Sequence, residues 1–294
     1  MSSALSPTSK AALSKLRSFA APTTNWHKCP ASRRAAVLIL LYPGLRGELR
    51  VVLTLRSAGL KSYAGQVALP GGKVDDEKET PFVAARREAF EEIGLPMRSA
   101  AGDAVEEITE MPSHLAMTEL AVRPCVAFMP HNLVVENESV RLEPNPDEVA
   151  AIFTAPFENF LKVDDMQDEG VEGQWYKGAW HDWLETKWRM HEFFVPVEHD
   201  PVIYPRAASA SLPEHGMHTE GSVTPNRWRV FGMTARILVD CARVAYGYEP
   251  EFEHNDHCGD EELVARLLRI GRLKDKEKEK SVLTRSIIKK AVKL

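Results

Sequence analysis

Cysteine is scarce in this chain, and no two cysteines have the close spacing of a zinc or redox motif. The four cysteines, at positions 29, 125, 241 and 258, are scattered, which is typical of reduced thiols rather than of a disulfide framework. Long hydrophobic runs are also missing, because the longest, residues 35–42, is too short to cross a bilayer. No secretory signal opens the chain. We therefore expect an intracellular, soluble protein without membrane insertion.

A basic excess is absent as well. Lys and Arg total 37 against 42 Asp and Glu, which gives a net charge of -5. Domains that bind nucleic acid usually carry a strong basic excess, so no nucleic-acid partner is expected. The 294 residues are enough for a substantial core, and no compositional break is clean enough to separate two domains. We expect one main domain over residues 31–272.

Three segments outside or within that domain have unusual compositions. Residues 1–34 contain no Asp or Glu, as in a mitochondrial transit peptide. Leu13, Leu16 and Phe19 have helical spacing, however, so we favour a docked amphipathic helix over residues 9–19 and keep targeting as the alternative for residues 1–30. Residues 200–226 predict a surface insertion, and residues 273–294 predict a charged tail.

Turn and capping residues define the most distinct elements. Residues 35–42 and 49–55 flank a Pro/Gly turn and predict a β-hairpin. Thr80 and Pro81 suit the N-cap and first position of a helix, and Gly94 suits its end, so a helix is predicted over residues 81–93. Further strands are predicted at 120–122, 126–129, 133–136 and 188–195, and further helices at 156–161, 231–245 and 260–270.

Three acidic residues on the predicted helix share one face. Glu88, Glu91 and Glu92 are spaced i, i+3, i+4, and like charges at this spacing repel each other. A divalent cation would turn the repulsion into coordination, and carboxylate oxygens suit Mg²⁺ or Mn²⁺. The alternative is an ordinary acidic surface helix. The opposite face carries Val83, Ala84 and Phe90, with Ala89 and Ile93 flanking, and its small residues are expected to let the helix pack closely on a sheet.

Two consecutive glycines precede this helix. Gly71 and Gly72 allow a close approach of backbone to a metal or phosphate. A Walker phosphate loop is excluded because Val67 stands where it needs Gly and Val74 where it needs Ser or Thr.

Residues 72–95 resemble the Nudix box, G-x5-E-x7-R-E-U-x-E-E-x-G-U, in which U is aliphatic. The second half fits at each specified position if Ala89 counts as aliphatic, whereas six residues rather than five separate Gly72 from Glu79. The resemblance implies the Nudix fold, an α/β architecture with a mixed β-sheet sandwiched between helices (α/β/α). Arg87 lies eight residues after Glu79, and an ion pair between them would pin the preceding loop to the helix.

Residues 52–72 resemble a second signature, L-L-T-x-R-S/A-x3-R-x3-G-x3-F-P-G-G, of the coenzyme A diphosphatase branch of that family. The spacing is kept, and Val52, Lys61 and Leu69 are conservative differences. The organisation resembles that of fungal peroxisomal members. The resemblance implies a small-molecule substrate, coenzyme A or acyl-coenzyme A, whose diphosphate bond is hydrolysed to 3′,5′-ADP and 4′-phosphopantetheine or its acyl form.

The resemblance also implies roles for individual residues, with Mg²⁺ or Mn²⁺ as the cofactor. The metal ligands would be Glu88, Glu91 and Glu92 with the carbonyl of Gly71, and the favoured general base is Glu88, with Glu148 as its rival. The substrate phosphates would be held by Arg56 and Lys61, with Gly65 and Gln66 in the wall of the loop. The structural residues of the box would be Gly72, Glu79, Arg87 and Gly94. For Arg56 and Lys61 the alternative is a solvated surface cation.

Other interpretations stay open. The chain could hydrolyse another nucleoside diphosphate derivative (an oxidised dNTP, NADH or ADP-ribose), or could be a non-catalytic nucleotide sensor. His254 to Cys258 carry metal-binding residue types, but at no recognised zinc spacing. Four tryptophans, at positions 175, 180, 183 and 188, could stack on adenine, although packing is favoured. The last residues, 292–294, resemble a peroxisomal address, with the mitochondrion and the cytosol as alternatives. No feature of the sequence indicates an oligomeric state.

Overall fold

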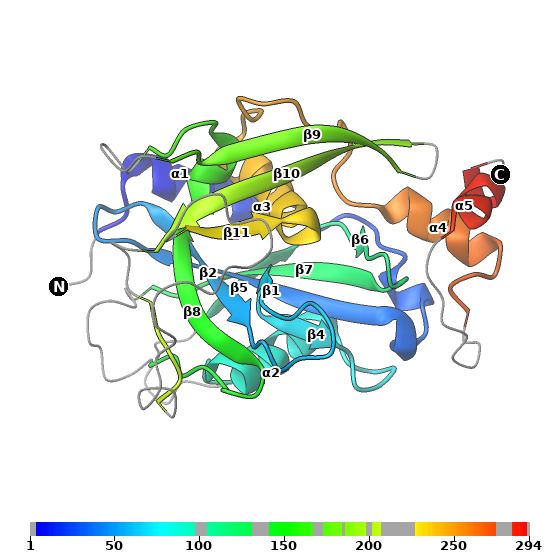
Figure 1. The fold of residues 1–294 in the computed structure, drawn as a ribbon, viewed down its shortest axis with the longest axis horizontal. Coiled ribbons are helices and arrows are strands. Elements are labelled where there is room, and N and C mark those ends of the chain that lie inside the picture. Colours follow the sequence, from blue (N-terminus) through cyan, green and yellow to red (C-terminus); the bar gives the residue numbers. More distant parts are fainter. Residues whose placement is uncertain are drawn as a thin grey trace.

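The computed structural model describes residues 4–97, 105–130, 141–166, 173–183, 186–197, 202–206, 227–274 and 284–292. A mixed eight-stranded sheet lies at the centre of the molecule (Figure 1). Its strands are β1 (Arg34–Pro43), β2 (Leu49–Arg56), β3 (Val67–Ala68), β4 (Gly71–Lys73), β5 (Glu106–Glu110), β6 (His114–Leu115), β7 (Ala121–Phe128) and β8 (Val149–Pro156). The main order is β3-β2-β1-β7-β5, and β4, β6 and β8 pair with β1, β7 and β2 respectively.

The predicted hairpin is confirmed. β1 pairs with β2 in antiparallel register, with Leu41 opposite Val51, and with β7 in parallel register, with Leu38 opposite Cys125. Nine of the ten residues of β1 are buried, as expected for an unbroken apolar run at the centre of a sheet.

Helices cover both faces of this sheet, which confirms the expected α/β/α sandwich. Because side chains alternate along a strand, Ile39 and Leu41 of β1 join the core under α1 and α3, whereas Leu38 and Leu40 join the core under α2. The helices are α1 (Pro7–Ser18), α2 (Pro81–Ile93), α3 (Gly232–Tyr246), α4 (Glu261–Arg269) and α5 (Arg285–Val292). None of these helices is long and apolar enough to span a membrane.

The N-terminal helix α1 is docked on the domain. Its Ala12, Leu13 and Leu16 are buried in the same core as α3, and Lys15 Nζ donates to the carbonyl of Tyr246 at the end of α3, at 2.6 Å. The docked amphipathic helix that the sequence favoured is therefore confirmed.

A second, three-stranded antiparallel sheet lies on the α3 side of the molecule, opposite α2 (Figure 1). It consists of β9 (Tyr176–Trp183), β10 (Thr186–Pro196) and β11 (Arg227–Phe231). The sequence predicted a strand only within β10. The prediction was incomplete because residues 176–183, YKGAWHDW, mix aromatic, polar and small residues without regular alternation and without the apolar run that marks β1.

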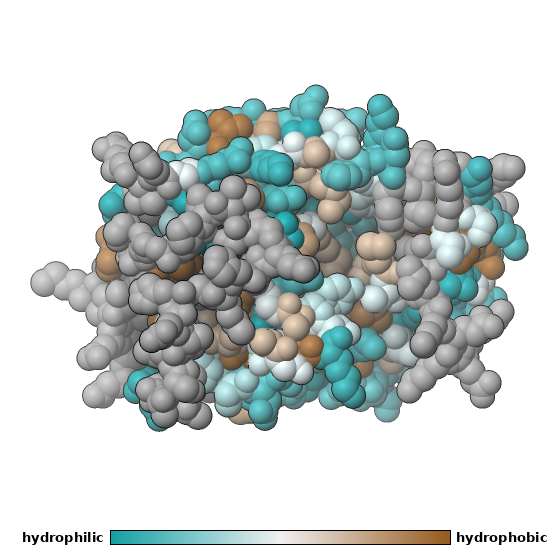
Figure 2. Space-filling view, in the orientation of Figure 1, coloured by the Kyte–Doolittle hydropathy of each residue, from teal (hydrophilic) through white to brown (hydrophobic). Residues whose placement is uncertain are grey.

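Smaller differences complete the comparison. The predicted helix at 156–161 is a 3₁₀ segment, η3 (Phe157–Leu161), and two more, η1 (Trp26–Lys28) and η2 (Ala31–Arg33), precede β1. The predicted strand at 133–136 and most of the insertion at 200–226 lie outside the described residues. In the predicted tail, α5 packs on α4 through the buried Ile288 and Ala291. On the face shown in Figure 2, hydrophobic residues form small groups between hydrophilic ones.

Candidate active site

Helix α2 begins and ends where its capping residues predict. The Thr80 hydroxyl accepts a hydrogen bond from the Val83 amide at 3.3 Å, and Pro81 follows in the first turn. Gly94 adopts a left-handed conformation, with φ of 67°, and its amide closes the helix onto Phe90. These caps fix the ends of the helix, so that Glu88, Glu91 and Glu92 all lie within its last two turns.

The three acidic side chains lie at the border of the buried face of α2, not opposite it. Their exposed fractions fall from 49% for Glu91 and 16% for Glu88 to 5% for Glu92. The expectation that Val83 and Phe90 pack on the sheet is wrong, because both side chains are half exposed. The expected packing of Ala84, Ala89 and Ile93 is confirmed, and Ala85 is buried with them, since small side chains allow the closest approach to the sheet.

Glu92 is a buried carboxylate held between a glycine amide and an arginine. Its Oε2 accepts from the Gly71 amide at 3.0 Å, and its Oε1 lies 3.7 Å from Arg56 Nη1. Burial raises the pKa of Glu92 to about 7, and the negative charges of Glu88 and Glu148 raise it as well. The hydrogen bond from Gly71 and the charge of Arg56 act in the opposite direction but do not outweigh burial. The site thus holds a carboxylate whose charge is poorly compensated by the protein.

Glu88 lies directly over the second glycine of the pair. A Cβ atom added at Gly72 would be 2.5 Å from the Glu88 carboxyl carbon, so any larger residue there would displace this carboxylate from its position. Gly71, with φ of +148°, would place a Cβ 2.3 Å from the Ala36 carbonyl of β1. Burial raises the pKa of Glu88, partly offset by Arg87, and the nearby negative charge of Glu148 also raises it.

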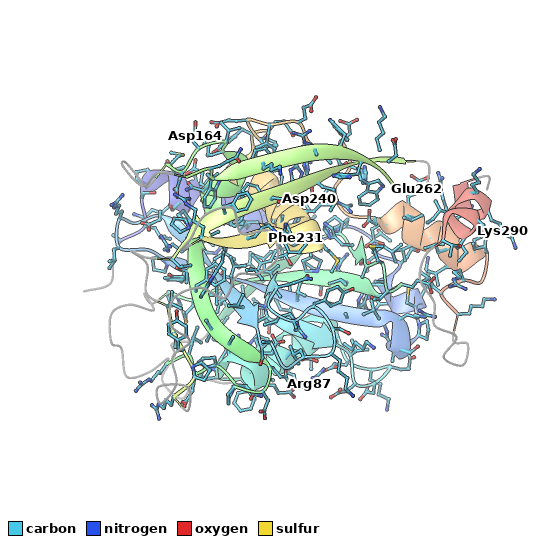
Figure 3. The ribbon with its side chains drawn as sticks, viewed as in Figure 1. Arg87, Asp164, Phe231, Asp240, Glu262 and Lys290 are labelled. Carbon is cyan, nitrogen blue, oxygen red and sulfur yellow. The ribbon has the colours of Figure 1, made fainter. Side chains whose placement is uncertain are left out.

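Arg87 ties the acidic face to the loop that precedes the helix. Its Nε donates to Glu79 Oε1 at 2.8 Å, which confirms the predicted pair, and its Nη2 donates to the Lys73 carbonyl at 2.8 Å. Its Nη1 donates to Glu88 Oε1 at 3.0 Å and lies 3.4 Å from Glu91 Oε2. Burial alone would raise the pKa of Glu79, but the bond from Arg87 lowers it. Arg87 lies at α2, on the opposite side of the large sheet from Asp240 (Figure 3).

Backbone bonds from the end of α2 bring Glu148 to the site. The amides of Glu143 and Asn145 donate to the last carbonyls of the helix, those of Ile93 and Glu92, each at 2.9 Å. The Glu148 carbonyl in turn accepts from the Ser57 amide at 2.8 Å. Sequence reasoning missed these contacts, although the Pro144-Asn145-Pro146 turn that allows them was visible in the sequence.

The loop after β2 carries the remaining predicted site residues. Arg56 closes it from one side, since its amide donates to the Gln66 carbonyl at 3.0 Å and its carbonyl accepts from the Gly65 amide at 3.1 Å. Gly65 has a φ of 68°, a left-handed conformation that favours glycine. Lys61 is exposed. Only Arg56 of the two predicted phosphate-binding cations therefore touches the acidic cluster.

Residues 32–200, more than half of the chain, match the model of the NUDIX domain. The chain belongs to the Nudix family. It is 32% identical over 275 residues to peroxisomal coenzyme A diphosphatase 1 of Saccharomyces cerevisiae, covering 84% of this chain and 78% of the relative. It is 31% identical over 220 residues to the mitochondrial Nudix hydrolase 15 of Arabidopsis thaliana, covering 75% of this chain and 61% of the relative. The protein is thus a Nudix hydrolase.

The donor chemistry of this Nudix box suits a divalent cation. As placed, no three acidic, histidine or cysteine side chains in the described part of the chain converge closely enough to hold a metal ion, and Arg87 contacts both Glu88 and Glu91. The carboxylates are nevertheless hard oxygen donors, and the raised pKa values of Glu88 and Glu92 show that burial and mutual repulsion disfavour their negative charges. A bound cation would relieve that repulsion.

The weaker sequence signals have structural explanations. His254 Nε2 bonds to Asp240 Oδ1 at 3.0 Å, so this histidine is already committed to a buried network. Trp175 is buried. The Arg236 guanidinium lies over the ring of Trp188, with its Cζ 4.0 Å from the ring centroid. Packing therefore accounts for these two tryptophans; the side chain of Trp183 lies outside the described residues.

Proposed function

We propose that this Nudix hydrolase cleaves the diphosphate bond of coenzyme A and its derivatives, using Mg²⁺ or Mn²⁺. The products would be 3′,5′-ADP and 4′-phosphopantetheine or its acyl form.

The observation that carries the substrate assignment is the contact between the two signatures. Arg56, from the segment that resembles the coenzyme A diphosphatase branch, lies 3.7 Å from Glu92 of the Nudix box. On the next residue, the Ser57 amide bonds to Glu148. A ligand phosphate bound by Arg56 would therefore lie beside the acidic cluster. The Saccharomyces relative, named as a coenzyme A diphosphatase, supports the same substrate.

Each side chain of the site has a proposed role. Glu88, Glu91 and Glu92, with the Gly71 carbonyl, would hold the cation, and a divalent cation bound there would supply neutralisation of phosphate charge and a lower pKa of water. Glu88 accepts the proton of the attacking water, and Glu148 is the rival for this role.

The loop side chains would bind the nucleotide. Arg56 and Lys61 bind phosphates, including the 3′-phosphate, and Gly65 and Gln66 shape the wall of the loop. Lys61 offers a point charge where the second signature has an arginine fork. The Lys61 side chain is exposed and therefore accessible to a phosphate of the substrate.

Hydrolysis of a substrate panel tests this proposal. Coenzyme A, acetyl-coenzyme A, NADH, ADP-ribose and an oxidised dNTP are incubated with the protein and Mg²⁺, and products are separated by chromatography. We expect the highest kcat/KM for a coenzyme A compound; a higher value for another nucleotide would support the alternative substrate, and no turnover at all would support a nucleotide sensor. In the same assay, Glu88→Gln and Glu148→Gln identify the base as the variant that loses the acidic limb of the pH–rate profile.

The compartment is part of the proposal as well. The two relatives are named as peroxisomal and mitochondrial proteins, and the last residues of this chain resemble a peroxisomal address. We propose the peroxisome, with the mitochondrion and cytosol as alternatives. A fluorescent protein fused in front of the last residues, with the native C-terminus free, would accumulate in peroxisomes and should become diffuse when those residues are removed.

A further inference from the structure

Tyr63 adopts a strained backbone conformation that the rest of the chain does not explain. Its φ is 55°, in the left-handed region that bulky residues avoid. Glu119 is the other non-glycine residue with positive φ among those described. Glu119 is fully buried and held by ion pairs to Arg33 at 3.1 Å and Arg272 at 2.7 Å, so its conformation is stabilised by contacts within the protein.

No such contact stabilises the Tyr63 side chain. It is 53% exposed, and within the described part of the structure it makes no ring contact and no side-chain hydrogen bond. Glycine would adopt the same backbone conformation without strain. Strained backbone conformations that the surrounding structure holds in place cluster at active and ligand-binding sites, and a ring without a partner among the described residues is free to contact a molecule outside the chain.

The loop places this ring in the proposed substrate site. The Tyr63 carbonyl accepts from the Gln66 amide at 3.2 Å, and Gln66 in turn bonds to Arg56. The loop is thus anchored at Arg56 and Ser57, the residues that contact Glu92 and Glu148. Lys61, two residues before the ring, supplies a positive charge. An exposed aromatic ring in a loop that follows one cation, Arg56, and contains another, Lys61, is suited to a base that carries phosphates.

We propose that Tyr63 is a specificity-determining residue that stacks on the adenine base of the substrate. The inference rests on the proposed function, since it assigns the adenine to the loop that binds the phosphates. Three of the tryptophans considered for this role have partners within the protein: Trp175 is buried, Trp188 stacks on Arg236, and Trp180 donates to Glu253 at 2.8 Å beside Arg189. In the loop itself, residues 57–66, Tyr63 is the aromatic residue.

Because the Tyr63 backbone is strained, removing its side chain should affect thermal stability and substrate binding in opposite directions. Tyr63→Gly should leave the thermal midpoint unchanged or raise it, because the strain is relieved, yet raise KM for coenzyme A about tenfold with kcat unchanged. Tyr63→Phe should keep the wild-type KM because it retains the ring. Tyr248→Ala removes a partly exposed tyrosine outside the loop and should leave KM unchanged. A wild-type KM in Tyr63→Gly would overturn the inference.

Binding without turnover separates this inference from the proposed function. Affinity for 3′,5′-ADP is measured by calorimetry in the presence of a chelator for the wild type, Tyr63→Gly and Tyr63→Phe. Loss of affinity in Tyr63→Gly alone supports the stacking role even if coenzyme A is not hydrolysed, in which case only the proposed function fails. Equal affinity in all three proteins, or no binding to the wild type, overturns the stacking role whatever the wild type hydrolyses.

Discussion

Lowering the pH from 8 to 5 should destabilise the folded protein by about 2 kcal/mol through one buried histidine, His191. This residue of β10 accepts a hydrogen bond at Nδ1 from the Tyr176 hydroxyl at 3.0 Å, and its Nε2 lies 2.9 Å from His254 Nδ1. The other nitrogen of His254 faces the Asp240 carboxylate at 3.0 Å. Because a carboxylate only accepts, His254 donates to Asp240 and His191 donates to His254. The remaining nitrogen of His191 accepts from Tyr176, so a further proton on His191 would break that bond.

The charges around His191 fix the sign of the effect. Burial lowers the pKa of His191 from the ordinary value of 6.5 to about 3, and the nearby His254, Arg189 and Arg236 lower it further. The negative charge of Asp240 acts in the opposite direction. The unfolded chain therefore binds more protons than the folded one between those two values, and stability falls as the pH drops below 6.5. Each pH unit below 6.5 contributes about 1.4 kcal/mol, which gives about 2 kcal/mol at pH 5.

Urea denaturation followed by tryptophan fluorescence at pH 5, 6, 7 and 8 measures this effect. His191→Phe keeps a ring of similar size but cannot be protonated. It should be less stable than the wild type at pH 8, because the Tyr176 hydroxyl loses its partner, at a cost of about 1–3 kcal/mol. Its loss of stability between pH 8 and pH 5 should be about 2 kcal/mol smaller than that of the wild type.

A matched variant controls for the other titrating groups. His27 is exposed, so His27→Gln should have the same pH dependence as the wild type. Equal losses of stability between pH 8 and pH 5 in the wild type and His191→Phe would refute the reasoning.

Three further predictions concern the acidic helix. Gly72→Ala places a methyl group 2.5 Å from the Glu88 carboxyl carbon, so kcat should fall about 100-fold with a nearly unchanged thermal midpoint; wild-type kcat would contradict the position of Glu88. Arg87→Lys loses the guanidinium that joins Glu79 and Glu88, and denaturation should show a loss of about 1.5–3 kcal/mol. Thr80→Ala removes the N-cap bond and should cost about 1 kcal/mol in the same assay with kcat retained, whereas a large loss of kcat would mean that the cap also shapes the site.

Local signals in the sequence were sufficient for much of the fold. The apolar run at 35–42, the Thr80 cap and the Gly94 terminator each determine backbone geometry within a few residues, so β1 and the bounds of α2 were predictable. The pairing of Glu79 with Arg87 was predictable for the same reason. The strands β9 and β11 lack a long apolar run, so their sequences did not reveal them: β9 forms a tight hairpin with β10, with Trp183 opposite Thr186, and β11 pairs with the same strand from 30 residues or more further along the chain.

The outward side of α2 illustrates the same limit within the site. Helical periodicity placed the acids on one face and correctly indicated that small residues such as Ala84 and Ala89 pack on the sheet, but it could not indicate that Val83 and Phe90 lie outside that contact. That choice depends on the close approach of the helix to β1 and β4, which is a tertiary property. The burial of Glu92 and the position of Glu148 depend on contacts of the same kind.

A titration of coenzyme A cleavage with Mg²⁺, run side by side on the wild type, Glu92→Gln and Glu262→Gln, tests the central claim most directly. Glu262 is an exposed glutamate on α4, far from the Nudix box in sequence, and its variant controls for the loss of one carboxylate. We predict that 3′,5′-ADP forms in proportion to bound Mg²⁺ with the wild type and Glu262→Gln, and that Glu92→Gln folds normally but releases almost none. Wild-type turnover by Glu92→Gln, or cleavage by the wild type that persists in excess chelator, would contradict the account.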